Sequence, residues 1–178
     1  IFNNLGPLTN PANSKYLLIG VPDISTGNKM SNALRILNKT ALVVHGMEGL
    51  DEASIFGDTY VWEIRPNPSI DEVNNETVNL AASTASLKEY KINPDQFGLK
   101  KIPIQNLQVN SPEESANKIL DLFNNRDKEL IDCVALNAGL GLYISGHAQD
   151  IKSGIELSKN NIKNGNAAKL ISSLSCNY

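Results

Sequence analysis

The sequence lacks the features that mark several large classes of protein. No apolar run in the sequence approaches the ~20 residues that span a bilayer, and we expect no signal peptide before the domain. Basic residues are not in excess, because 16 Lys and Arg stand against 19 Asp and Glu, for a net charge of −3. Sequence-independent binding of nucleic acid needs a basic face. We therefore expect neither a membrane nor a nucleic acid as a partner.

Cysteine is also scarce, and the common glycine motifs of catalytic sites are missing. Cys133 and Cys176 show neither metal-ligand nor redox spacing, so we expect two reduced thiols in a cytoplasmic protein. The chain contains no G-x-x-x-x-G-K-[ST], no G-x-G-x-x-G after a strand and no G-x-S-x-G. Gly139 and Gly141 lie in an apolar helical context, which indicates packing and not phosphate binding.

Two apolar stretches near the start of the chain enclose an amphipathic one. Residues 16–21 and 41–44 are apolar almost throughout, as is typical of strands covered on both faces. Between them, helical spacing places four residues on one stripe: Met30, Ala33, Leu34 and Leu37. Strand, helix and strand in this order predict a βαβ unit in a parallel sheet. Alternation over 59–64, and more weakly over 87–92, predicts two further strands.

The last third of the chain is predicted to be helical. Residues 111–114, S-P-E-E, form a capping box with Pro at the first helical position. The expected buried stripe of this helix consists of Ala116, Ile119, Leu120 and Phe123. Residues 128–144 are apolar on most sides, which predicts a central buried helix. Two more helices are expected, one from Ile151 to a stop at Gly165 and a short one over 167–174.

One segment does not fit either periodicity. Residues 66–85 contain two prolines and several Asn and Thr, so they form either a long excursion or a short surface helix near 71–82. With the remaining elements, the expected fold class is α/β, as a three-layer domain with a mainly parallel sheet and a C-terminal run of helices.

Two adjacent carboxylates, Asp51 and Glu52, follow the second apolar strand. Ligands of open α/β sheets bind beyond the carboxyl ends of the strands, and Gly46 and Gly49 allow a tight loop there. Neighbouring carboxylates repel unless a cation lies between them, and Mg²⁺ takes oxygen ligands. A magnesium site is one interpretation. A solvated acidic loop or helix N-terminus, where acidic residues are common, is the other.

Two polar residues lie inside apolar segments. His45 ends the second apolar strand beside the acidic pair, where it could act as an acid or base at neutral pH. The commoner arrangement is a structural histidine whose hydrogen bonds are satisfied. Asn137 falls within the apolar helix and must find a hydrogen-bond partner there, which favours a structural role.

Three strings, in this order and at about these distances, resemble anthranilate phosphoribosyltransferases. They are I-F-N-N-L-G-P-L-T-N-P-A (1–12), A-L-V-V-H-G-M-E-G-L-D-E (41–52) and L-N-A-G-L-G-L-Y (136–143). A fourth string, N-P-D-Q-F-G-L (93–99), is similar as well. The resemblance implies an enzyme of tryptophan biosynthesis that transfers phosphoribose from phosphoribosyl diphosphate to the amine of anthranilate, with release of diphosphate.

The same resemblance implies roles for four residues. Asp51 and Glu52 match the family's acidic pair and would hold Mg²⁺ against the diphosphate. Gly6 and Pro7 match a family hinge that lines the entrance to the anthranilate site, so they are expected to bind substrate. No residue of this chain is assigned a catalytic role, because displacement of diphosphate depends on positioning and metal neutralisation and needs no protein nucleophile.

The resemblance also bears on the organisation of the protein. Residues 1–178 match the C-terminal α/β catalytic portion of the family, without its N-terminal helical domain and phosphate-binding loop. We therefore expect the chain alone to be inactive, and the complete enzyme to be a homodimer that forms through the helical domain. Two alternatives stay open: a pyrimidine nucleoside phosphorylase-like enzyme, and a non-catalytic nucleic-acid-binding relative, in which the acidic pair would have no role.

Overall fold

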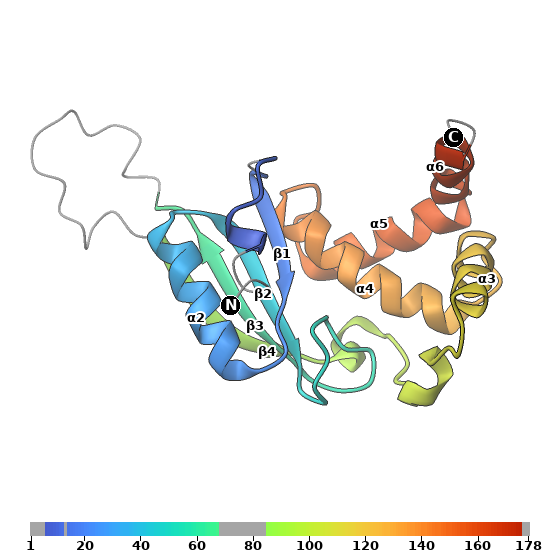
Figure 1. The fold of residues 1–178 in the computed structure, drawn as a ribbon, viewed down its shortest axis with the longest axis horizontal. Helices are drawn as coiled ribbons and strands as arrows, with labels where there is room; N and C mark the ends of the chain where they lie inside the picture. The colour runs from blue at the N-terminus through green and yellow to red at the C-terminus, as the bar shows by residue number, and fades with distance from the viewer. Residues whose placement is uncertain (1–5, 13, 68–84, 176–178) are drawn as a thin grey trace, which may run out of the picture. The chain divides into compact units, whose positions relative to one another are not determined.

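The computed structural model describes residues 6–12, 14–67 and 85–175 (Figure 1). The chain divides into two compact units, and each is described by itself. The first unit comprises Ile1–Ser54 and Asp58–Ile92, and the second comprises Ile55–Gly57 and Asn93–Tyr178. The helix or excursion expected near 71–82 lies outside the described residues.

In its described residues, the first unit is a four-stranded sheet with one α-helix. Its elements are the 3₁₀ turn η1 (Gly6–Leu8), β1 (Tyr16–Gly20), α2 (Ile24–Ile36), β2 (Thr40–Gly46), β3 (Thr59–Arg65) and β4 (Ser86–Ile92). The strands lie in the order β1-β2-β3-β4. β1 and β2 are parallel and joined through α2, so the predicted βαβ unit and all four predicted strands are confirmed.

The expectation of a mainly parallel sheet is wrong for the described strands. β3 runs antiparallel to both β2 and β4, so only one of the pairings is parallel. A parallel neighbour needs a crossover connection, usually through a helix. The connection from β2 to β3 instead begins and ends at the same edge of the sheet, where the amide of Met47 donates to the carbonyl of Asp58 at 2.9 Å. The α/β class is confirmed, and the three-layer arrangement stays a prediction.

The core of the first unit lies between α2 and the sheet (Figure 1). It consists of Ile19, Val21, Met30, Leu34, Ala41, Val43, Trp62, Ile64 and Ala85. α2 lies close to the sheet because Gly27 faces the ring of Trp62, where a Cβ atom would overlap the ring. The indole Nε1 of Trp62 donates to the side-chain oxygen of Asn28 at 2.9 Å. Gly27 and the hydrogen bond of Asn28 thus determine where α2 packs on the sheet.

β1 differs from the strand that its composition predicts. Tyr16 and Leu18 are each 37% exposed, although a strand so apolar was expected to be covered on both faces. Burial alternates along the strand: Leu17 and Ile19 belong to the core beneath α2, whereas Tyr16 and Leu18 point to the other face of the sheet. β2, by contrast, is buried at every residue from Ala41 to Gly46.

The second unit is helical, which confirms the expected C-terminal run of helices. It contains η3 (Pro94–Phe97), η4 (Ile104–Leu107), α3 (Pro112–Phe123), α4 (Lys128–Ile144), α5 (Ile151–Lys163) and α6 (Asn166–Ser175). α4 and α5 touch backbone to backbone, because Gly139 of α4 lies against Gly154 and Ile155 of α5. The interpretation as a packing residue is therefore confirmed for Gly139 and wrong for Gly141, where a Cβ atom would meet nothing within 4 Å. No helix in the described part of the chain has the length and apolar character to cross a membrane.

The buried stripe expected on α3 is confirmed only at Phe123, which is half-buried and packs against a buried cluster of the second unit, and is wrong at its other residues. Ala116 is exposed, and the side chains of Ile119 and Leu120 are 45% and 50% exposed. Leu122 is buried instead, in a cluster with Ile131 and Ile162. Helical spacing identifies which residues share a face, but several overlapping faces of this helix are apolar, and only packing selects among them.

The start of α3 also differs in detail from the predicted capping box. The hydroxyl of Ser111 accepts from the amide of Glu114 at 3.1 Å, as predicted. The carboxylate of Glu114 reaches back to the amide of Asn110 at 2.7 Å, one residue before the N-cap. The helix-terminal amide of Glu113 itself, together with a hydrogen bond from the hydroxyl of Ser111, holds the pKa of Glu113 below its ordinary value.

Candidate functional site

The acidic loop, residues 47–54, leaves the carboxyl end of β2. The amide of Gly46 donates to the carbonyl of Leu50 at 2.9 Å, and the amide of Gly49 donates to the carbonyl of Gly46 at 2.8 Å. Gly49 adopts a φ of 101°, a conformation that side chains other than glycine rarely allow. The two glycines therefore make the tight loop that the sequence predicts.

The acidic pair lies where the ends of the two parallel strands meet. The backbone carbonyl of Asp51 lies directly over Gly20, the last residue of β1, and a Cβ atom at Gly20 would overlap it. Asp51 and Glu52 are both exposed. This is the carboxyl-end edge at which α/β sheets bind ligands, so the pair lies at the edge that the sequence predicts, and its metal role stays a prediction.

Neither carboxylate of the pair has a hydrogen-bond or ion-pair partner among the described residues. The same residues hold no cluster of three or more potential metal ligands. Two unpaired carboxylates fit Mg²⁺, which keeps several waters and is usually bound by one or two carboxylates plus substrate phosphates. They do not form the many-oxygen cage of a structural Ca²⁺ site.

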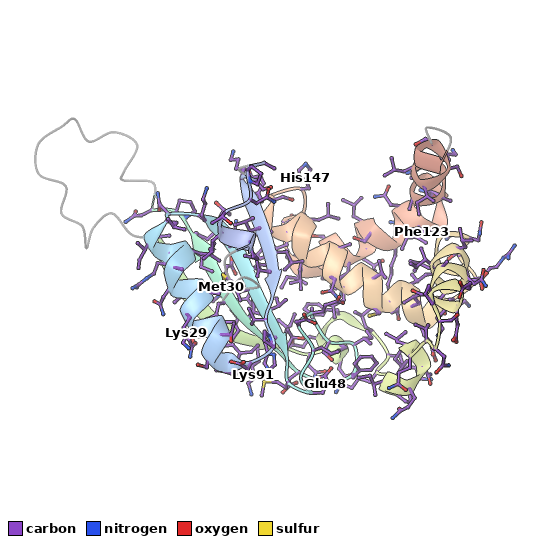
Figure 2. The ribbon with its side chains drawn as sticks, viewed as in Figure 1. Lys29, Met30, Glu48, Lys91, Phe123 and His147 are labelled. Carbon is purple, nitrogen blue, oxygen red and sulfur yellow. The ribbon has the colours of Figure 1, made fainter. Side chains whose placement is uncertain are left out.

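A third carboxylate of the acidic loop is already engaged. The hydroxyl of Ser54 donates to Oε1 of Glu48, which Figure 2 labels on the connection between β2 and β3. The amide of Ser54 donates to Oγ1 of Thr59 at 2.7 Å. Ser54 is 1% exposed and Thr59 is fully buried. The end of the acidic loop is therefore held by buried hydroxyl groups, and no motif in the sequence predicted this arrangement.

His45 lies on the α2 face of the same strand ends. Its side chain is buried, and Nδ1 lies 2.9 Å from the carbonyl oxygen of Val21. A carbonyl only accepts, so Nδ1 carries the proton and ties the end of β2 to the chain that follows β1. This supports the structural interpretation of His45 over a role as acid or base.

Asp23 begins α2 at this edge. Its Oδ1 accepts from the amide of Thr26 at 2.7 Å. This bond, the hydroxyl of Thr26 and, to a smaller extent, the nearby imidazole of His45 hold the pKa of Asp23 below its ordinary value. Asp23 is thus an N-cap whose charge stabilises the helix start.

The predicted substrate-binding pair lies elsewhere. Gly6 and Pro7 form the turn η1, in which Gly6 is exposed and Pro7 is half-buried. Pro7 lines a small cavity together with residues of β1, α2 and the start of β2: Leu8, Asn10, Ser14, Leu17, Leu34, Leu37 and Lys39. Figure 1 shows η1 beside the first half of β1.

The structure does not bring the two predicted pairs together. The cavity at Pro7 reaches Leu17, near the start of β1, whereas Asp51 covers Gly20 at the end of the strand. At a rise of about 3.3 Å per residue, these two points of β1 are roughly 10 Å apart. Any site that used both pairs would have to extend along the strand.

Asn137 is half-buried in α4, and its side-chain amide donates to the carbonyl of Cys133 at 3.2 Å, one turn earlier. The expected hydrogen bond therefore exists, within the helix itself.

Comparison with known proteins places these residues in a family. Residues 1–168 match the family described as "Glycosyl transferase family, a/b domain". The chain is 37% identical over 172 residues to the anthranilate phosphoribosyltransferase of Xylella fastidiosa (strain 9a5c), an alignment that covers 96% of this chain and 45% of that protein.

Solved structures give the same result. The anthranilate phosphoribosyltransferase of Thermus thermophilus superposes with a TM-score of 0.77 at 33% identity, over 97% of this chain and 46% of the other. The Saccharomyces cerevisiae enzyme in complex with PRPP and Mg superposes with a TM-score of 0.76 at 24% identity, over 94% and 44% of the two chains; at that identity the likeness concerns the fold. The chain spans less than half the length of the proteins it matches.

Proposed function

Because the chain belongs to the glycosyl transferase family, through its a/b domain, we propose that it is part of an anthranilate phosphoribosyltransferase. The reaction is transfer of phosphoribose from phosphoribosyl diphosphate to the amine of anthranilate, with release of diphosphate. The observation that carries this proposal is the place of the string A-L-V-V-H-G-M-E-G-L-D-E, which ends in two unpaired carboxylates at the carboxyl ends of β1 and β2.

The domain organisation is part of the proposal. Residues 1–178 supply the C-terminal α/β portion, and a helical domain and the phosphate-binding loop come from the remainder of the relatives' length. The chain alone is then inactive, the complete enzyme is a homodimer through its helical domain, and its location is the cytoplasm. The net charge of −3 argues against a nucleic-acid partner, which would need a basic face.

In this proposal Asp51 and Glu52 hold Mg²⁺. The bound ion neutralises charge on the diphosphate as it leaves. The contribution of the chain is positioning: the tight loop at Gly46 and Gly49 keeps the two carboxylates next to each other, exposed and unpaired. The yeast enzyme of the same fold was solved with PRPP and Mg, which agrees with this ligand pair.

Gly6 and Pro7 line the entrance to the anthranilate site in the same proposal. Their turn is seated on the sheet, because Pro7 borders the same cavity as Leu17 and Leu34. Since the acidic pair lies at the other end of β1, the two pairs serve different parts of the reaction, one toward the acceptor and one toward the diphosphate.

The test is a chimera in which this chain replaces the matching segment of the Xylella fastidiosa enzyme. Loss of anthranilate fluorescence with phosphoribosyl diphosphate and Mg²⁺ measures transfer. We expect activity in the chimera and none in the chain alone. Asp51→Asn with Glu52→Gln should lower kcat/KM by at least about 100-fold, because loss of an outer-shell partner of a metal site alone costs about 10–100-fold, and should raise the Mg²⁺ requirement.

Glu156→Gln, at an exposed carboxylate of α5, is the matched control and should leave kcat/KM unchanged. A folded chimera that cleaves pyrimidine nucleosides with phosphate but ignores anthranilate would support the phosphorylase alternative. An unchanged Mg²⁺ dependence in the double variant would refute the metal role of the pair.

A further inference from the structure

The acidic loop is restrained through its backbone while its two carboxylates are left free. This contrast, which rests on the proposed function of the pair, points to Ser54 and Thr59, which follow the family string that ends at Glu52, and to Glu48 within that string. Two like charges held side by side repel, weakly when they are exposed to water, and a cation bound between them relieves that repulsion. A preorganised cation site needs both features.

The first restraint closes the loop at its base. Thr59 is the first residue of β3 and lies opposite Gly46, the last residue of β2. Its Oγ1 accepts from the amide of Ser54 at 2.7 Å, and both residues are buried. A buried amide without a hydrogen-bond partner destabilises the fold, so this bond determines where the returning limb of the loop begins.

The second restraint ties the two limbs to each other. The hydroxyl of Ser54, on the returning limb, donates to the carboxylate of Glu48, on the outgoing limb. Hydrogen bonds to an ionised acceptor are roughly twice as strong as neutral ones. This bond closes a ring around residues 49–53, and the acidic pair lies within that ring.

The third restraint is the glycine floor, by which we mean Gly20 and Gly46, the strand-end residues against which the loop packs. The carbonyl of Asp51 occupies the space of the missing side chain of Gly20. At Gly46, a Cβ atom would lie 3.1 Å from Cβ of Leu50, 3.2 Å from Cβ of Ser54 and 3.3 Å from the carbonyl oxygen of Glu52. Both limbs of the loop therefore rest on glycines at the ends of β1 and β2.

We propose that Thr59, Ser54 and Glu48 are positioning residues that, above the glycine floor at Gly20, hold the carboxylates of Asp51 and Glu52 ready for a divalent cation. They act through the backbone of the loop and do not touch the ion. Loosening any of them lets the like-charged pair separate, and binding of the ion must then overcome the cost of bringing the carboxylates together again.

The test uses Mn²⁺ alone as the probe with the ¹⁵N-labelled 178-residue chain. Paramagnetic broadening of the amide signals of the acidic loop, followed as Mn²⁺ is added, gives an apparent Kd. Thr59→Val removes the acceptor at almost constant volume, and Thr59→Ser restores it. We expect Thr59→Val to weaken binding about 10-fold, the lower end of outer-shell effects on metal sites, and Thr59→Ser to bind as the unaltered chain does.

Ser54→Ala is the second variant. It breaks the bond to Glu48 but keeps the charge of that residue, so a change in simple electrostatic attraction cannot explain its effect. We expect weaker binding of Mn²⁺, with amide signals of α2 and β4 unshifted as evidence that the fold persists. Equal or tighter binding in Ser54→Ala or Thr59→Val would overturn the inference.

Asp51→Asn with Glu52→Gln separates this inference from the proposed function. If the double variant abolishes the broadening and Thr59→Val does not change it, the metal role of the pair stands and the positioning role fails. If the double variant binds Mn²⁺ as the unaltered chain does, the metal role itself fails, and the positioning role fails with it.

Discussion

The contact between α4 and α5 allows a sharp test of packing. A Cβ atom at Gly139 would lie 2.7 Å from the backbone nitrogen of Ile155 and 3.0 Å from the carbonyl carbon of Gly154. Backbone atoms cannot rotate away as a side chain can, so Gly139→Ala must separate the two helices locally. A Cβ atom at Gly141, two residues further along α4, would meet nothing within 4 Å.

The magnitude follows from two opposing effects. Both substitutions remove a helical glycine, which stabilises the helix by about 0.5–1 kcal/mol. Only Gly139→Ala also overpacks the interface, at a cost of about 1–3 kcal/mol. Helix propensity cancels in the difference between the two variants, so Gly139→Ala should be less stable than Gly141→Ala by about 1–3 kcal/mol, the overpacking cost alone.

Urea unfolding followed by far-ultraviolet circular dichroism measures this difference, because α4 and α5 are helices of the second unit. Trp62, the single tryptophan, lies in the first unit, and its fluorescence reports whether that unit is affected. Each kcal/mol corresponds to about 2–4 °C in Tm for a chain of this size. Equal stability of the two alanine variants would refute the argument that the glycine pair sets the distance between the helices.

Two further predictions concern single side chains. The hydrogen bonds from Thr26 to Asp23 lower the pKa of Asp23 in the folded state. The contribution of Asp23 to stability is therefore complete above its ordinary pKa of 3.8 and is lost as the pH falls through the lowered pKa. Asp23→Ser keeps an N-cap without the charge and should flatten this part of the acid-unfolding curve; an unchanged curve would contradict the assignment. Lys159 of α5 and Asp132 of α4 form an ion pair of 2.8 Å whose side chains are 28% and 25% exposed. Lys159→Met keeps an unbranched stem of the same length and removes the charge, so it should lower the free energy of unfolding by less than about 1 kcal/mol, with a smaller loss at high salt. A loss that does not change with salt would contradict an electrostatic contribution of the pair.

Much of the local structure follows from periodicity. The helix expected over 128–144 has the same bounds as α4, and the four predicted strand segments correspond to the four observed strands. These predictions succeed because a buried stripe at helical spacing, or a short apolar run between turn residues, has few other ways to bury its surface. The location of Asp51 and Glu52 was predictable for a related reason: they follow a strand whose parallel neighbour precedes it through a helix.

Strand direction and helix face could not be obtained in this way. An apolar strand such as β2 has the same composition whether its neighbour is parallel or antiparallel. The connection between β2 and β3 contains no helix, but this indicates an antiparallel direction only once the two strands are known to be paired. On α3, the overlapping apolar faces differ only in what they meet, and Leu122, not Ile119, meets the rest of the unit.

The sequence by itself therefore determined which segments form elements, which family the motifs resemble and where two carboxylates follow a strand. The tertiary structure alone decided which residues restrain the loop that carries those carboxylates. Gly20 and Thr59 are 31 and 8 positions from Asp51 along the chain, and neither belongs to a motif. Their roles exist because folding brings the end of β1 and the start of β3 against one loop, a long-range proximity that local patterns of residues do not encode.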